Sequence, residues 1–79
     1  MNRQELQQEA KQLEKMIAKQ LVEEFGKSLT EAEKLVKEAK IYNLVMENEL
    51  ALHESPHQWA LSILTQSGDE ETLEKYYNQ

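Results

Sequence analysis

Apolar residues in the first third of the chain recur every three or four positions, the spacing of one face of an α-helix. The stripe comprises Leu6, Ala10, Leu13, Ile17, Leu21 and Phe25. Asn2, with Glu5 three residues later, is typical of a helix start, because an Asn side chain can accept a hydrogen bond from a free backbone N–H. Gly26 suits the left-handed position that ends a helix. We therefore predict a helix over residues 3–25.

A second apolar stripe follows two overlapping capping patterns, Ser28 with Glu31 and Thr30 with Glu33. We prefer Thr30 as the cap and predict a helix over residues 30–53. Its apolar positions are Ala32, Leu35, Ala39, Tyr42, Met46 and Leu50. A further stripe begins halfway along, on the opposite side of that helix: Ile41, Leu44, Val45 and Leu52. The second half of the helix thus has two apolar faces, and we expect the C-terminal segment to cover one of them.

Two shorter helices complete the predicted layout. Ser55 and Pro56 mark a boundary, because proline disfavours helical geometry in the residue before it and is well tolerated at a first helical position. The third helix is predicted over residues 56–66, ending at the Ser-Gly pair that follows it. Asp69 then caps a fourth helix over residues 70–77. No run of alternating β-branched residues predicts a strand.

These elements predict an all-α fold and one small helical domain spanning residues 1–79. The short connection after Gly26 makes the first two helices an antiparallel hairpin, capped by the short third helix and the shorter C-terminal fourth helix as a small helical bundle. The predicted core comprises Leu13, Ile17, Leu21, Leu35, Ala39, Tyr42, Val45, Met46, Trp59, Ala60, Ile63 and Leu64.

Composition narrows the classes of function. The chain has no cysteine, which excludes disulfides, thiolate zinc sites and iron–sulfur clusters. Its net charge of −6 argues against binding to nucleic acid, which requires a basic surface. No apolar run approaches the roughly 20 residues of a membrane span, and the polar start lacks the apolar stretch of a secretory signal. We expect an acidic, cytoplasmic protein that does not bind membranes.

The charge is segregated along the chain. Residues 1–40 hold eight basic and eight acidic side chains, whereas residues 41–79 hold one basic and seven acidic ones, so the C-terminal half carries the whole net charge. Three of the five aromatic residues, Trp59, Tyr76 and Tyr77, lie in that half as well. Acidic charge beside aromatic anchors favours contact with a basic protein surface. The candidate partner-contact residues are Glu70, Glu71, Glu74, Tyr76 and Tyr77, and adjacent helical positions allow one tyrosine to be buried while the other is exposed.

His53 and His57 match the H-E-x-x-H spacing of zinc proteases, in which both histidines lie on one helix. Pro56 falls inside the motif and should end that helix, placing the two imidazoles on different helices. We therefore predict no metal site, and we expect His57→Ala to leave stability nearly unchanged. No Gly-rich phosphate loop or nucleophile constellation is present, so we predict no cofactor and no enzymatic activity.

Lys11, Lys15 and Lys19 form a ridge at helical spacing, which we interpret as a solvated face because glutamates surround it. The favoured function is a small non-enzymatic, intracellular protein–protein interaction domain of an adaptor or regulatory kind. The alternative is a structural homodimer in which two hairpins pair into a four-helix bundle.

Overall fold

The computed structural model describes residues 1–78, which are helical and contain no strand. In chain order the elements are α1 (Arg3–Glu23), α2 (Leu29–Glu38), α3 (Ile41–Glu47), the 3₁₀ helix η1 (Glu49–His53), α4 (Pro56–Gln66) and α5 (Glu70–Tyr77). They form an elongated bundle measuring 42 × 21 × 18 Å. The all-α fold class predicted from the sequence is confirmed.

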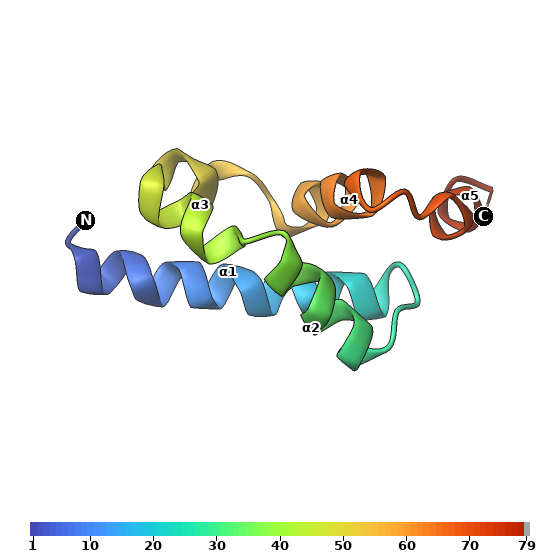
Figure 1. Cartoon of the computed structure of the whole chain (residues 1–79), viewed down its shortest axis with the longest axis horizontal. Helices are drawn as coiled ribbons and strands as arrows, with labels where there is room; N and C mark the ends of the chain where they lie inside the picture. Colours follow the sequence, from blue (N-terminus) through green and yellow to red (C-terminus); the bar gives the residue numbers. More distant parts are fainter. Residues whose placement is uncertain (79) are drawn as a thin grey trace.

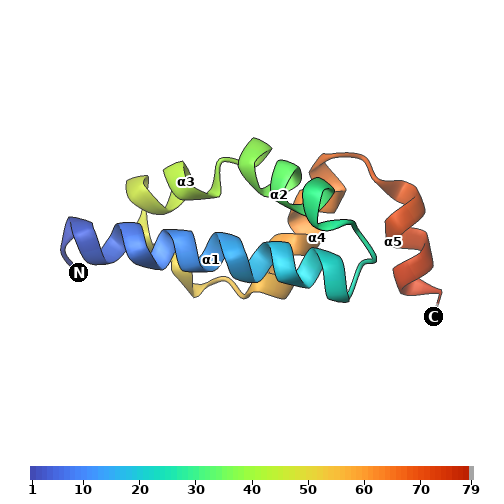
Figure 2. The ribbon, with the colours of Figure 1, turned by 90° about the horizontal axis from the view of Figure 1, so that it is seen from below.

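Helix α1 is the element on which the bundle is built. It runs along the long axis, with α3 beside its first half and α2 and α4 beside its second half (Figures 1 and 2). Helix α5 lies beyond the α1–α2 turn, at the end of the molecule opposite the N-terminus. None of the helices in residues 1–78 combines the length and the apolar character needed to cross a bilayer.

Most helix ends follow the predicted capping residues. The Asn2 side chain accepts a hydrogen bond from the Glu5 amide at 2.8 Å. Likewise the Ser55 hydroxyl accepts from the amide of the third residue of α4 at 3.1 Å, and Asp69 caps α5. Gly26 adopts φ 73°, the left-handed conformation that ends α1. These predicted ends are confirmed because each depends on contacts within a few residues of the chain.

Helix α2 begins one residue earlier than predicted. The Ser28 hydroxyl accepts a hydrogen bond from the Glu31 amide at 3.2 Å, so Ser28 is the N-cap and Thr30 already lies inside the helix. The preference for Thr30 was wrong. Both residues satisfy the local capping pattern, so the sequence alone does not decide between them.

The single helix predicted over residues 30–53 is wrong as well. Lys40 adopts a left-handed conformation, with φ 56° and ψ 41°, and separates α2 from α3. Asn48 is extended and separates α3 from η1. The break reorients the chain so that Ile41 and Val45 are completely buried on the side where α3 packs against α1. Ile41 and Val45 of the second apolar stripe are therefore buried where α3 packs against α1, and not under the C-terminal segment, whereas Leu44 of the same stripe is 41% exposed.

The core lies between α1 and the segments that pack on it. Its buried residues are Ala10, Leu13, Ile17, Ala18, Leu21, Phe25, Ala32, Val36, Ile41, Val45, Ala60, Ile63 and Leu64. Seven predicted core residues are among them. The other predicted core residues are only partly buried: Leu35, Ala39, Tyr42 and Trp59 pack against the core, and Met46 is half-buried outside it. The break at Lys40 accounts for Tyr42 and Met46, because beyond it Ile41 and Val45 are the fully buried residues of α3.

Candidate functional site

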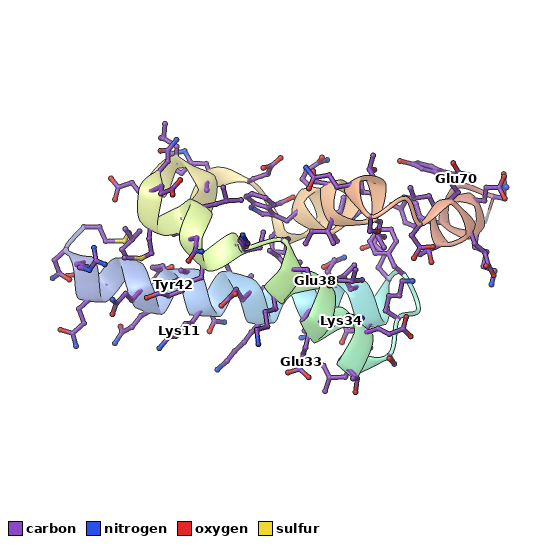
Figure 3. The ribbon with its side chains drawn as sticks, in the orientation of Figure 1. Lys11, Glu33, Lys34, Glu38, Tyr42 and Glu70 are labelled. Atoms are coloured by element: carbon purple, nitrogen blue, oxygen red, sulfur yellow. The ribbon has the colours of Figure 1, made fainter. Side chains whose placement is uncertain are left out.

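The outer side of α5 carries most of the predicted contact residues. Glu70, Glu71 and Glu74 are exposed and are called here the acidic face. Glu70, Glu74 and Tyr77 follow one another at helical spacing, so they lie along one side of the helix. Tyr77 is 68% exposed. Glu71 pairs with Lys75 at 3.2 Å, which leaves the other two glutamates as the main source of negative charge on α5. Figure 3 shows Glu70 at the far end of the molecule, well away from Lys11 on α1.

Tyr76 faces inward. Its ring centroid lies 4.7 Å from that of Phe25, a buried residue at the end of α1. The Tyr77 ring meets the Tyr76 ring edge-on at 5.2 Å. Among the five predicted contact residues, Tyr76 thus holds α5 on the bundle, while Tyr77 remains available on the surface.

An ion pair fixes the start of α5. Lys27, in the turn after α1, contacts the Asp69 carboxylate. Asp69 also caps α5, accepting hydrogen bonds from the Thr72 amide at 3.2 Å and the Thr72 hydroxyl at 2.9 Å. The hydrogen bond from Lys27 holds the pKa of Asp69 below its ordinary value, outweighing the opposite effect of burial. The acidic face is therefore presented by a helix whose N-cap residue, Asp69, is bound to Lys27 in the α1–α2 turn.

A second polar cluster joins three helices at the same end. The Glu24 carboxylate lies 2.9 Å from His57 Nδ1, and the Tyr76 hydroxyl lies 3.5 Å from His57 Nε2. Partial burial raises the pKa of Glu24, but hydrogen bonds from Tyr76, His57 and Gln20 outweigh it and lower the pKa overall. Hydrogen bonding to Glu24 raises the pKa of the Tyr76 hydroxyl. These contacts link the end of α1 to α4 and α5.

His53 and His57 lie on different elements, η1 and α4, as the position of Pro56 predicts. Within residues 1–78, no three His, Asp or Glu side chains are grouped so that they could hold a metal ion. His57 nevertheless has contacts that we did not foresee, with Glu24 and with the Phe25 ring, whose centroid is 6.0 Å away. The expectation that His57 contributes little to stability overlooked these contacts.

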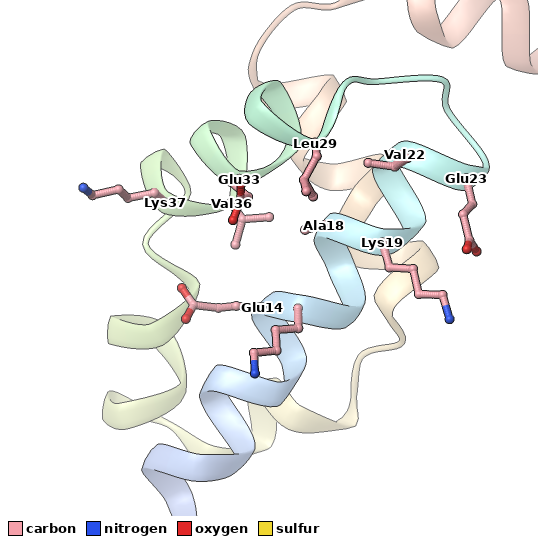
Figure 4. Close-up of a pocket in the computed structure, with 10 residues that line it drawn as sticks. Glu14, Ala18, Lys19, Val22, Glu23, Leu29, Glu33, Val36 and Lys37 are labelled. Atoms are coloured by element: carbon pink, nitrogen blue, oxygen red, sulfur yellow. The ribbon is translucent and has the colours of Figure 1, made fainter.

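An open groove lies between α1 and α2, with a volume of about 610 Å³ (Figure 4). Its apolar lining comprises Ala18, Val22, Leu29 and Val36, and its charged lining comprises Glu14, Lys15, Lys19, Glu23, Glu33 and Lys37. Leu29 is 60% exposed there. Partial burial raises the pKa of Glu14, and the nearby Lys11 only partly offsets this effect. We call this feature the α1–α2 groove.

The groove was not predicted from the sequence. A signal was present, because Val22, Leu29 and Val36 are apolar but fall outside the stripes that define the predicted helix faces. Two members of the lysine ridge, Lys15 and Lys19, line the groove, and all three ridge lysines are exposed. The interpretation of the ridge as a solvated face is therefore incomplete, since part of it edges an apolar surface.

Comparisons with protein-family models, with curated proteins and with solved structures found no match to this chain.

Proposed function

We propose that this chain is a small non-enzymatic, intracellular protein–protein interaction domain whose acidic face binds a partner with a basic surface. The observation that carries the proposal is the exposed side of α5, where Glu70, Glu74 and Tyr77 lie in one line. The segregation of the whole net charge of −6 into residues 41–79 supports it, because charge needed only for solubility has no reason to be concentrated.

The acidic and aromatic residues have separate roles in this proposal. Exposed carboxylates act mainly on association rate and partner choice, and they are screened by salt. Tyr77 supplies the amphipathic contact area that anchors many protein interfaces. Tyr76, first considered for the same role, instead positions the helix through Phe25.

The test begins with a partner captured from the native host by pull-down and continues with a titration of purified proteins. One variant reverses the acidic face to lysine at Glu70, Glu71 and Glu74. A control of equal charge change reverses three exposed glutamates elsewhere, Glu9, Glu38 and Glu47. We expect the first variant to slow association strongly and the control to do so only weakly, and wild-type binding to weaken above roughly 0.15 M salt. Circular dichroism verifies that both variants are folded.

Equal loss of binding in the two glutamate variants would contradict the proposal, because it would show that binding depends on the net charge of the chain and not on the position of the charges. A further variant with Lys11, Lys15 and Lys19 reversed to glutamate distinguishes the other charged surface. If binding is lost only in that variant, the contact surface lies on α1.

A further inference from the structure

The α1–α2 groove exposes apolar surface that nothing in residues 1–78 covers. Val22 and Leu29 both line it, Val22 half-buried and Leu29 with 60% of its surface exposed. An apolar groove with charged edges is typical of a helix-docking surface. The charged residues that line the groove indicate which partner fits it.

The groove is electrically balanced, while the rest of the molecule is acidic. Three lysines and three glutamates line it, and all of them lie in residues 1–40, which carry no net charge. Two copies that met through their C-terminal halves would bring together surfaces that are both strongly negative. Copies that meet through the groove bring together neutral surfaces instead. Charge therefore permits self-association at the groove and opposes it at the acidic half.

The charges are also distributed unevenly along the groove. Figure 4 shows Lys37 and Glu23 at opposite ends of the groove. Lys15 and Glu14 precede Glu23 by about two turns of α1, so they lie toward the Lys37 end, where two lysines outweigh one glutamate. A two-fold axis crossing the groove sets the Lys15 end of one copy against the Glu23 end of its partner. Such a pairing repeats each contact twice, as an isologous interface requires.

We propose that a second copy of this chain docks in the α1–α2 groove, so that the α1–α2 hairpins of the two copies form an antiparallel four-helix interface. The pairing buries Leu29 and Val22 and matches Lys15 with Glu23 at both ends. It leaves the two α5 helices outside the interface, so the dimer presents two acidic faces. The proposal is independent of the proposed function, because self-association needs no other partner.

Sedimentation equilibrium of the purified chain over a range of concentrations tests the proposal. We expect a reversible dimer, and a chain that remains monomeric up to about 100 μM overturns the proposal. Leu29→Gln should raise the dimer dissociation constant roughly tenfold or more, because it removes an apolar side chain buried by pairing. Leu50→Gln is the matched control, since Leu50 is 64% exposed on η1, outside the groove, and should leave the constant unchanged.

A charge exchange tests the orientation. Lys15→Glu and Glu23→Lys should each weaken dimerisation, because each places like charges opposite one another. The double variant should restore it to near the wild-type constant, because the opposite charges then face each other again. Additive loss in the double variant overturns the two-fold pairing. All these measurements omit any basic partner, so their failure leaves the proposal for the acidic face standing, and a failure of that proposal leaves them unaffected.

Discussion

Helices α1 and α5 are held on the bundle by different forces. Helix α1 buries five residues, three of which are Leu or Ile side chains with at most 6% exposure. Helix α5 buries none completely: Leu73 and Tyr76 pack only partly buried against the core, and the Lys27–Asp69 ion pair fixes its start. Apolar burial is insensitive to direction and salt, whereas ion pairs and ring contacts depend on charge and geometry. Helix α5, which carries the acidic face, is therefore less firmly attached to the bundle than α1.

The largest expected effect comes from truncating the α1 core. Leu21 is completely buried, so Leu21→Ala should lower the free energy of unfolding by about 2–5 kcal/mol, enough to unfold a small domain outright. Leu50→Ala is the control and should change it by less than about 0.5 kcal/mol, since Leu50 is largely exposed. Urea denaturation followed by circular dichroism measures both. Equal effects in the two variants would mean that α1 is not the centre of the core.

The next effect should be confined to α5. Tyr76→Ala removes the ring that packs on Phe25 and should lower the melting temperature by roughly 5 °C. Tyr77→Ala should leave it nearly unchanged, because that ring is mostly exposed. Hydrogen exchange should show faster exchange in α5 than in α1 in the Tyr76 variant. Uniformly faster exchange along the chain would show instead that α5 and α1 unfold as one unit.

The smallest effect is a loosening of α5 in acid. The pKa of Asp69 lies below its ordinary value of 3.8 in the folded chain, so the Asp69 carboxylate stabilises the fold above that pH. This contribution is lost as pH falls through the lowered pKa. NMR chemical shifts of α5 should therefore respond to Asp69 protonation below pH 3.8.

Asp69→Asn is the control for this acid response. Asparagine keeps the capping geometry but carries no charge, so the variant should lose the part of the response that Asp69 causes. An unchanged acid response in this variant would mean that another carboxylate causes it. Glu24 would then be the first candidate, because its pKa is also lowered.

Local signals in the sequence predicted most of the fold. Asn2, Ser55 and Asp69 each satisfy a backbone amide within three residues, so their roles follow from the chain itself. The break at Lys40 could not be predicted in this way, because lysine rarely adopts a left-handed conformation and no glycine or proline lies beside it. The double apolar stripe was the available signal. Two apolar faces on one helix mean either that another segment covers the second face or that the helix breaks and the chain turns. Only the burial of Ile41 and Val45 in α3 distinguishes the two possibilities.

The candidate site divides in a similar way. Helical spacing alone places Glu70 and Glu74 on one side of α5. Which of Tyr76 and Tyr77 faces the bundle depends on Phe25. This residue is distant from both tyrosines in sequence, and only the packing of α5 brings its ring close to that of Tyr76. The α1–α2 groove is lined by residues of both helices, so its shape depends on the angle between them. The spacing of apolar residues within one helix carries no information about that angle.

The arrangement of the core on α1 has a consequence for how the chain folds. Helix α1 precedes α4 in the chain, and three of the buried side chains that complete its packing, Ala60, Ile63 and Leu64, belong to α4. A nascent chain that ends before α4 therefore exposes the apolar stripe of α1. Bringing α4 back to α1 across the intervening α2, α3 and η1 costs chain entropy before the contacts return any stability. We therefore expect the rate of folding to depend on contact between α1 and α4, which are distant in sequence, although almost every hydrogen bond of the folded chain is local.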